Sequence, residues 1–215
     1  MPFGFLKRNK DDPAAAKPKA PTARPGGPST AFEGLTEEWR LVGRMHVKGR
    51  LTDALNKRES ITISEVNWAP IDGSGQLEPA PGLKAIDPYD LILVVAGESD
   101  LPPLTEAERS AHKVHKIDYD VALEAPPFRV IGTVHLYPGS DPDRLLDRAT
   151  EMFVPVTDAI AYLGDTTVSD PEVGVVLVNR FYLRGVEQVD KRTGLKPQKL
   201  PGAPLGGTSW QDRSR

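Results

Sequence analysis

The sequence contains no cysteine among its 215 residues. This absence excludes disulfide bonds, thiolate metal sites and cysteine nucleophiles. No apolar run approaches the roughly 20 residues that a membrane-spanning helix needs. Lys7 also interrupts the apolar residues at the N-terminus too early for the hydrophobic core of a signal peptide. We therefore expect a cytoplasmic location, with peripheral contact at the inner face of the membrane as the alternative.

Motifs of the common enzyme classes are also absent. The sequence has no glycine-rich phosphate loop and no Gly-x-Ser-x-Gly nucleophile elbow. The pair His112 and His115 has the spacing of two zinc ligands on a helix, with Asp118 or Asp120 as a third ligand. We interpret this pair as a solvated junction, because two lysines flank it. We therefore expect no enzyme activity, no cofactor and no metal.

Acidic residues cluster in the second half of the chain. Paired carboxylates can serve glycosidic or metal-assisted chemistry. Their spacing here fits the start and the exposed face of a short helix, which explains them without catalysis. The cluster consists of Asp141, Asp143, Asp147, Glu151 and Asp158.

Charge is divided unevenly along the chain, whose net charge is −3. Residues 1–30 hold six basic and two acidic side chains, and residues 192–215 hold five and one. The segment between them therefore has a balance of −11. Because an acidic surface repels phosphate backbones, we expect this body not to bind nucleic acid specifically.

Proline, alanine and lysine dominate residues 11–28, which lack any large apolar side chain. Such a segment cannot bury enough surface to offset its ordering entropy, so we predict disordered basic tails at residues 1–31 and 191–215. The first tail would act as a flexible tether. Its start is interpreted as an ordinary chain end, with a weak membrane or partner anchor as the alternative. The anchor residues would be Phe3, Phe5, Leu6, Lys7 and Arg8.

An internal repeat is the strongest signal in the sequence. Residues 39–47 align without gaps with residues 128–136 at a shift of 89 positions, and an arginine, a glycine and a histidine recur. Two further blocks recur in the same order, residues 51–56 against 142–147 and residues 61–66 against 154–159. Similarity at a nearly fixed spacing predicts a duplicated structural unit. The recurring glycines, Gly43 and Gly132, indicate a bulge or a close approach of another strand.

Each copy predicts a strand, a short helix and two further strands. The last strand, residues 91–96 with counterpart 173–178, is a nearly continuous apolar run, which is typical of strands buried on both faces. A strand over residues 117–124 and a short helix at 105–110 are expected between the copies. The expected fold is α+β and mostly β. Its two similar units, residues 32–100 and 101–190, would pack about a pseudo-twofold axis.

The pattern Gly43-x-x-His46, followed by Leu51-x-Asp53-x-Leu55-Asn56, resembles an uncharacterised bacterial domain family of unknown function. The second copy is similar at Gly132-x-x-His135, with Asp147 where the pattern prefers asparagine. The resemblance covers residues 38–66 and 117–189. It implies two tandem copies of one domain, and it implies no catalytic residue.

One candidate binding site follows from the repeat. Strand alternation gives the first block of each copy one polar face. These faces carry Arg40, Arg44 and His46 in the first copy and Arg129, Thr133 and His135 in the second. If the copies pack symmetrically, arginines and protonable imidazoles converge in a way that suits a small anion such as phosphate or carboxylate. The simpler interpretation is that each histidine bonds locally at the end of its strand.

The duplication, the flexible arm and the lack of catalytic motifs together favour a non-catalytic protein-interaction or scaffold module. Its partner would be another protein, and its N-terminal tail would act as a tether. The alternative is a regulatory or sensor domain that binds a small anion or metabolite on the faces of His46 and His135.

Overall fold

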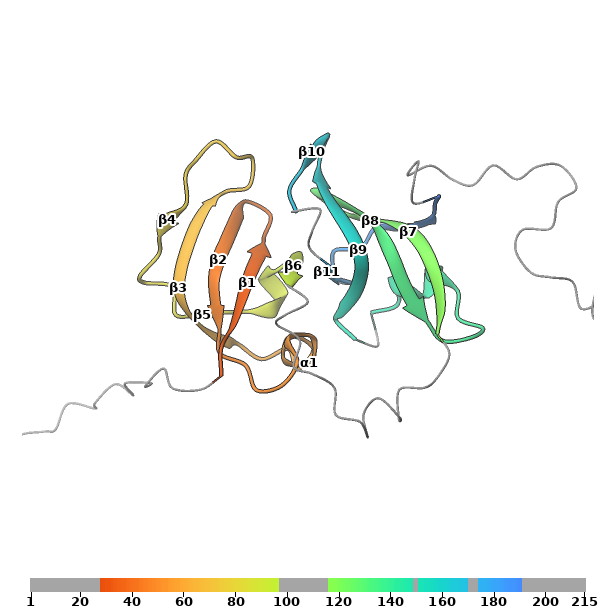
Figure 1. Ribbon diagram of the computed structural model, residues 1–215, viewed down its shortest axis with the longest axis horizontal. Helices are drawn as coiled ribbons and strands as arrows, with labels where there is room; N and C mark the ends of the chain where they lie inside the picture. Colours follow the sequence, from red (N-terminus) through yellow and green to blue (C-terminus); the bar gives the residue numbers. More distant parts are fainter. Residues whose placement is uncertain (1–27, 97–115, 149–150, 170–173, 191–215) are drawn as a thin grey trace, which may run out of the picture.

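The computed structural model describes residues 28–96, 116–148, 151–169 and 174–190. These parts are mostly β and form one antiparallel sheet of twelve strands with a single short α-helix (Figure 1). The mostly β prediction is confirmed. None of the helices in these ranges is long and apolar enough to cross a membrane.

Several predicted features lie outside the described residues. They are the anchor peptide at residues 3–8, the second basic tail, the expected helix at 105–110, and the pair His112 and His115. The first tail is described only from residue 28 onward. Its predicted limit at residue 31 is too late, because the first strand already begins at Thr30.

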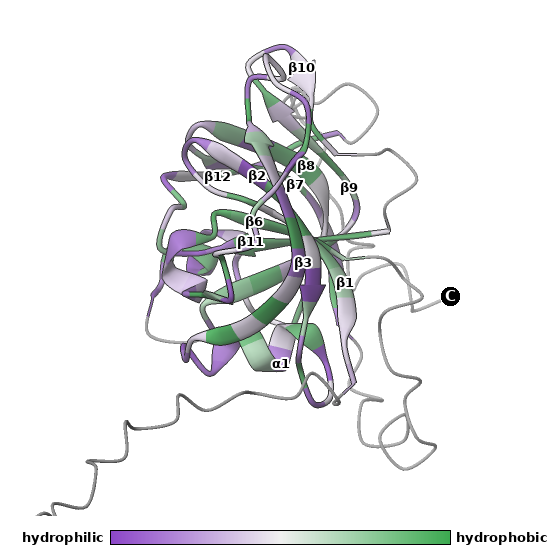
Figure 2. Cartoon of the chain, turned by 90° about the vertical axis from the view of Figure 1, so that its left-hand side faces the viewer, coloured by the Kyte–Doolittle hydropathy of each residue, from purple (hydrophilic) through white to green (hydrophobic). Residues whose placement is uncertain are grey.

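The first unit contains six strands and α1. Their bounds are β1 (Thr30–Leu35), β2 (Trp39–Met45), α1 (Leu51–Asn56), β3 (Ile61–Pro70), β4 (Glu78–Pro79), β5 (Ala85–Ile86), the 3-10 helix η1 (Pro88–Asp90) and β6 (Leu93–Ala96). Hydrophobic and hydrophilic residues alternate along β3, which is buried on one face only (Figure 2). By contrast, all four residues of β6 are buried, as its continuous apolar run predicts.

The second unit also contains six strands. Their bounds are β7 (Ile117–Ala125), β8 (Phe128–Leu136), the 3-10 helix η3 (Pro142–Leu146), β9 (Phe153–Leu163), β10 (Thr166–Thr167), β11 (Val175–Asn179) and β12 (Gly185–Gln188). The predicted helix start is confirmed, because an Asp141 carboxylate oxygen accepts the Asp143 N–H at 2.9 Å. The short helix itself is 3-10 rather than α.

Both units have the same strand order. The five main strands of the first unit are β1, β2, β3, β5 and β6, and those of the second are β7, β8, β9, β11 and β12. Across the sheet, each unit has the strand order fifth, first, second, third, fourth. This order is β6-β1-β2-β3-β5 in the first unit and β12-β7-β8-β9-β11 in the second. The remaining strands, β4 and β10, are short and extend the far ends of β3 and β9.

The recurring glycines occupy equivalent bulges. The register between the second and third strands shifts beside Gly43 in one unit and beside Gly132 in the other. A Cβ atom on Gly132 would lie 2.9 Å from the Thr157 carbonyl oxygen, and one on Gly43 would lie 3.0 Å from that of Ser64. Both glycines therefore allow the third strand to approach closely, as predicted.

The two units meet where β6 pairs with β11 over four residue pairs, from Leu93 opposite Val178 to Ala96 opposite Val175. This contact joins the fifth strand of the first unit to the fourth strand of the second, so it is head-to-tail. A pseudo-twofold axis would require either that the same strand of each unit meets its counterpart or that β12 also pairs with β5. Neither pairing is found within the described ranges, so the structure does not confirm the expected symmetric packing. The expected counterparts, residues 91–96 and 173–178, are neighbours in the sheet, and β12 holds in the second unit the place that β6 holds in the first.

The junction is buried and rigidly bonded. The side chain of Asn179 is fully buried and donates to the Leu91 carbonyl oxygen at 2.7 Å. Farther along, the Phe153 N–H donates to the side-chain oxygen of Asn56 at 2.7 Å. Each of the two core clusters includes residues from both units. The two units therefore form one continuous body.

Candidate functional site

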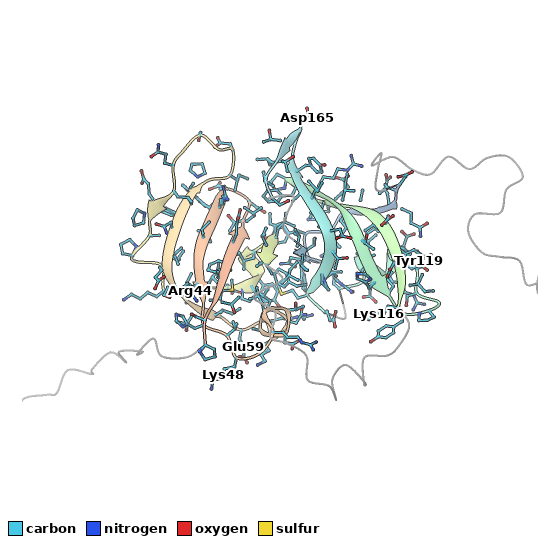
Figure 3. All side chains as sticks on the ribbon, in the orientation of Figure 1. Arg44, Lys48, Glu59, Lys116, Tyr119 and Asp165 are labelled. Carbon is cyan, nitrogen blue, oxygen red and sulfur yellow. The ribbon has the colours of Figure 1, made fainter. Side chains whose placement is uncertain are left out.

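The residues predicted to form one anion site do not converge. The strands that carry them, β2 and β8, lie on opposite sides of the central pair β6 and β11 (Figure 1). Figure 3 shows the same separation, with Arg44 in one half of the body and Tyr119, which pairs with β8, in the other. His46 lines a cavity of about 280 Å³, whereas His135 lines a different cavity of about 470 Å³.

The predicted arginines and threonine instead bind residues near them. Such local partners hold the side chains in place and do not leave a shared cationic surface. The contacts are Arg40 with Glu33 at 2.7 Å, Arg129 with Glu124 at 3.0 Å, Arg44 with the Ser29 hydroxyl at 2.9 Å, and Thr133 with Asp120 at 2.8 Å.

Each repeated histidine bonds a hydroxyl on the third strand of its own unit. The Nε2 atom of His46 lies 2.8 Å from the Ser64 hydroxyl oxygen, and Nε2 of His135 lies 2.8 Å from that of Thr157. This equivalence agrees with the simpler interpretation of local bonding. His135 has a further partner, because its Nδ1 atom lies 2.6 Å from a carboxylate oxygen of Asp118.

Asp118, His135 and Thr157 thus lie in a row like an acid, base and nucleophile. The Thr157 side chain is not among those that line the cavity beside His135. Its hydroxyl also donates to the Thr133 carbonyl oxygen at 3.3 Å, and the hydroxyl contact recurs at His46. We interpret the row as a structural bond between β7, β8 and β9.

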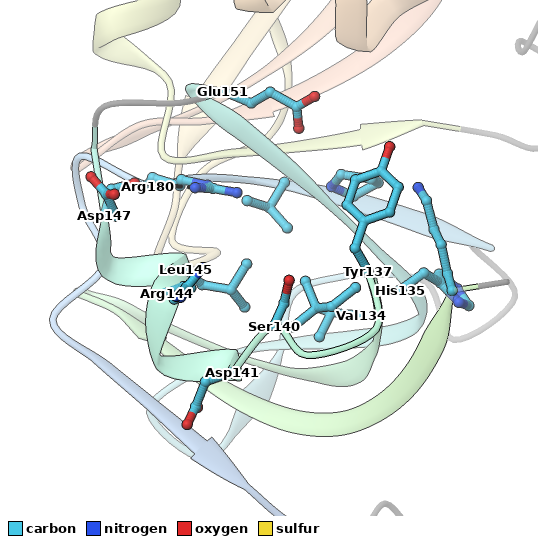
Figure 4. Close-up of a pocket in the computed structure, with 14 residues that line it drawn as sticks. Val134, His135, Tyr137, Ser140, Asp141, Arg144, Leu145, Asp147, Glu151 and Arg180 are labelled. Carbon is cyan, nitrogen blue, oxygen red and sulfur yellow. Dashed lines mark hydrogen bonds between the residues drawn. The ribbon is translucent and has the colours of Figure 1, made fainter. Parts of the chain in front are cut away.

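The cavity beside His135 is the larger candidate binding site (Figure 4). It is enclosed by the end of β8, the loop that leads into η3, the start of β9 and the residue after β11. The polar residues that line it are Lys116, His135, Tyr137, Ser140, Asp141, Arg144, Asp147, Glu151 and Arg180. Of this set, the sequence had singled out His135 as part of the expected anion site and, separately, Asp141, Asp147 and Glu151 as members of an acidic cluster.

Charges of both signs surround this cavity in equal number. Three cationic and three carboxylate residues are among those that line a volume of about 470 Å³. Burial lowers the pKa of the Arg180 guanidinium, while the nearby Glu151 and Asp147 carboxylates raise it. Arg180 also donates to the Asp147 carbonyl oxygen at 3.1 Å, so its position is fixed. Such a site suits a small ligand that carries both charges better than a simple anion.

No metal site is evident in the described ranges, where no group of three or more histidine, aspartate or glutamate side chains is placed to hold an ion. Two of the cationic side chains that line the cavity, Lys116 and Arg180, also have partners of their own. The Lys116 ammonium, for example, lies 5.5 Å from the centre of the Tyr137 ring.

A second candidate surface is the tryptophan pair at the outer end of β2 and β3. The rings of Trp39 and Trp68 stack with centres 4.8 Å apart, yet the residues are 37% and 40% exposed. Their counterparts in the second unit, Phe128 and Ala161, are 1% and 0% exposed. This surface could not be predicted from the sequence, because the repeat alignment shows equivalent positions but not their exposure.

Comparison of the chain with known proteins finds no matching family model, curated protein or solved structure. The resemblance to an uncharacterised bacterial domain family therefore stays a prediction.

Proposed function

We propose that the chain is a non-catalytic protein-interaction module that binds its partner through the Trp39–Trp68 pair. The observation that carries this proposal is the contrast between the units, since the same position is exposed in one and buried in the other. Large aromatic side chains are enriched in the buried centres of protein interfaces. Their stacking also fixes the rings before a partner arrives, which lowers the entropy cost of binding.

The surroundings of the pair fit a protein partner. Leu77, in the loop that follows β3, is 45% exposed, and Glu78 lies opposite Trp68 in the register of β3 and β4. An apolar centre with a charged residue beside it is the usual composition of an interface. In this proposal the N-terminal segment serves as the tether.

We further infer that the two units arose by duplication, as tandem copies of one domain. The same strand order, the bulges at Gly43 and Gly132, and the hydroxyl contacts of His46 and His135 support this inference. These features recur at the shifts that the sequence blocks have, and convergent packing of two unrelated units gives no reason for that agreement.

Replacement of the tryptophan pair is expected to weaken partner binding. A Trp39→Ala/Trp68→Ala variant removes the apolar anchors, and the loss of one interface hot spot costs about 2 kcal/mol or more, which is roughly thirtyfold in affinity. Quantitative cross-linking and affinity purification of the full chain from its native host would measure the loss. Tyr137→Ala is the matched control, because Tyr137 is an exposed aromatic, 59% accessible, in the other unit.

The folded state of each variant would be checked by thermal unfolding. Partners recovered equally well with the double variant and with the wild type would contradict the role of the tryptophan pair. Loss of the same partners with Tyr137→Ala would place the interface on the second unit.

A second candidate function is the binding of a small metabolite in the cavity beside His135. The observation that favours it is the balanced ring of cations and carboxylates around about 470 Å³. This modifies the alternative from the sequence, because the ligand would bind within one unit and would carry both charges. Free amino acids and short peptides belong to this chemical class.

A zwitterionic ligand is expected to raise the melting temperature of the wild type and to leave a Lys116→Ala/Arg144→Ala variant unchanged. The reason is that a ligand stabilises the folded state only where it binds it. A thermal-shift screen with amino acids and dipeptides would measure this, with His46→Ala as the control because His46 lines a different cavity. A screen in which no compound shifts the wild type would exclude this function for the classes tested.

A further inference from the structure

The strands β6 and β12 are equivalent edges of their units. Each begins with the same bond to the first strand, since the Ile92 N–H donates to the Leu35 carbonyl oxygen and the Arg184 N–H donates to that of Glu124, both at 2.8 Å. The register then continues alike, with β6 antiparallel to β1 and β12 antiparallel to β7. The fifth strand of each unit therefore has the same backbone geometry.

The strands β5 and β11 are equivalent in the same way. Each is followed by a turn that a side-chain oxygen stabilises. In the first unit Asp87 accepts the Tyr89 N–H at 3.0 Å, and in the second Asn179 accepts the Phe181 N–H at 3.0 Å. Both strands also pair with the start of the third strand. The fourth strand of each unit is thus built alike.

One fourth strand and one fifth strand are joined inside the chain, where β11 pairs with β6. One of each is left over. Within the described ranges β12 ends the sheet and pairs only with β7, and β5 pairs only with β3. The molecule therefore presents two different edges that have the same backbone geometry as the two edges of its own junction.

We propose that β12 of one chain pairs with β5 of a second chain as β6 pairs with β11, so that copies of this protein assemble head to tail. The proposal rests on the interaction function proposed above and names the partner as a second copy of the chain. A head-to-tail contact repeats indefinitely, so the copies form a closed ring or an open filament according to the rotation at each step.

The free hydrogen-bonding groups have the required alternation. On β12, the Val189 N–H donates to the Asp120 carbonyl oxygen, so the outward backbone groups belong to Val186 and Gln188. On the other edge, the Lys84 carbonyl oxygen accepts from the third strand, so the outward groups that remain free are the N–H and C=O of Ala85 and the C=O of Leu83. The Leu83 N–H donates to the Ala80 carbonyl oxygen at 3.0 Å. The internal junction follows the same alternation.

Transfer of the internal register to the outer edges also matches charges. The internal pairs are Val176 with Val95, Leu177 with Val94 and Val178 with Leu93. Their equivalents between copies are Lys84 with Glu187, Ala85 with Val186 and Ile86 with Gly185. An ion pair thus replaces a valine pair, which favours this register and keeps both edges soluble in a single chain.

The tryptophan pair lies on the face that a second copy would cover. Inside the chain, Leu35 and Ile92 of the first unit pack in one core cluster with Phe128, the counterpart of Trp39. In the contact between copies, Glu124 takes the position of Leu35 and Arg184 takes that of Ile92. A guanidinium group over a tryptophan ring is a favourable contact, so this assembly would cover the exposed aromatic surface.

One difference makes the contact between copies weaker than the internal one. Asn179 donates across the junction to the Leu91 carbonyl oxygen, whereas its equivalent, Asp87, cannot donate when ionised. The assembly is therefore reversible and depends on concentration. An Asp87→Asn variant is expected to associate more tightly than the wild type.

Two full-length variants, each blocked at one edge, test the proposal. Proline is tolerated where the backbone N–H of an edge strand faces outward, so Val186→Pro blocks β12 and Ala85→Pro blocks β5. Analytical ultracentrifugation would measure the masses of the wild type, of each variant and of their equimolar mixture. The wild type should form oligomers as concentration rises, each variant should stay monomeric, and the mixture should stop at a dimer of one copy each.

Other outcomes overturn the proposal. These are a wild type that is monomeric over roughly a hundredfold range of concentration, or an oligomer that survives in both proline variants. Charge exchange gives a second test. Lys84→Glu and Glu187→Lys should each weaken the association of copies, and a mixture of the two variants should restore it. If the chain is monomeric but still recovers another protein through the tryptophan pair, the interaction function stands and only self-assembly is excluded.

Discussion

Replacement of Asn179 by aspartate is expected to destabilise the folded chain by about 3 kcal/mol at neutral pH. Asn179 is fully buried and donates to the Leu91 carbonyl oxygen across the junction of the two units. An ionised carboxylate there would lose this hydrogen bond and would face a carbonyl oxygen instead. The junction would therefore open or the chain would unfold.

The same variant should depend on pH in a defined direction. Burial raises the pKa of a carboxyl group, and a protonated carboxyl can again donate to Leu91. Because the folded state would bind the proton more tightly than the unfolded state, the variant should recover stability, relative to the wild type, as the pH falls. Urea unfolding at neutral and mildly acidic pH would measure both effects.

Asn56 provides the matched control for this substitution. It also lies at the junction, but its side-chain oxygen accepts from the Phe153 N–H, which a carboxylate can do as well. Asn56→Asp is therefore expected to change the free energy of unfolding by less than about 1 kcal/mol. Equal effects of the two substitutions would show that the hydrogen bond from Asn179 does not hold the units together.

A Gly132→Ala substitution should have the second large effect, a loss of about 2–3 kcal/mol. The added Cβ would lie 2.7 Å from the Val156 Cγ1 atom, 2.9 Å from the Thr157 carbonyl oxygen and 3.0 Å from the Ala159 Cα atom. Two of these are backbone atoms of β9. Relief of the clash would therefore move β9, the strand that pairs with β11.

Two other glycines set the scale for this effect. Gly43→Ala is less crowded, with its closest contact at 3.0 Å, and should cost about 1 kcal/mol. Gly185→Ala meets only ordinary contacts at 3.6 Å and should change stability little. Thermal and urea unfolding of the three variants would rank them. An equal loss at Gly132 and Gly185 would show that close strand approach is not the reason for the glycine.

Local features of the fold could be predicted from the sequence. Residues 128–136 form the strand that their alternation predicts, and residues 51–56 form the predicted helix. Gly43 and Gly132 lie at bulges. These features depend on neighbouring residues and on one strand beside another, so a local pattern contains the information.

The packing of the two units could not be predicted in the same way. The apolar runs in β6 and β11 resemble each other because both strands are buried in the junction, and the resemblance was interpreted as repeat equivalence. The true equivalent of β6 is β12, which lies at an edge within the described ranges and carries the polar residues Glu187 and Gln188 instead. Burial pattern thus reports the environment of a strand and not its ancestry.

The candidate sites show a similar limit. The repeat indicated that His46 and His135 occupy equivalent places in their units. They do not converge, because β2 and β8 lie on opposite sides of the β6 and β11 pair. The cavity beside His135 depends on Lys116 and Arg180, which are distant from each other in the sequence. The exposure of the tryptophan pair likewise depends on which unit has a neighbour on that face.

Amide hydrogen exchange gives the most direct test of edge pairing between copies. The Val94 amide, which belongs to the internal junction, should exchange slowly at every protein concentration. The equivalent amide of Val186 and the outward amide of Ala85 should exchange fast in dilute solution and slow as the protein is concentrated. Fast exchange of Val186 and Ala85 at all concentrations, with Val94 still protected, would contradict head-to-tail pairing.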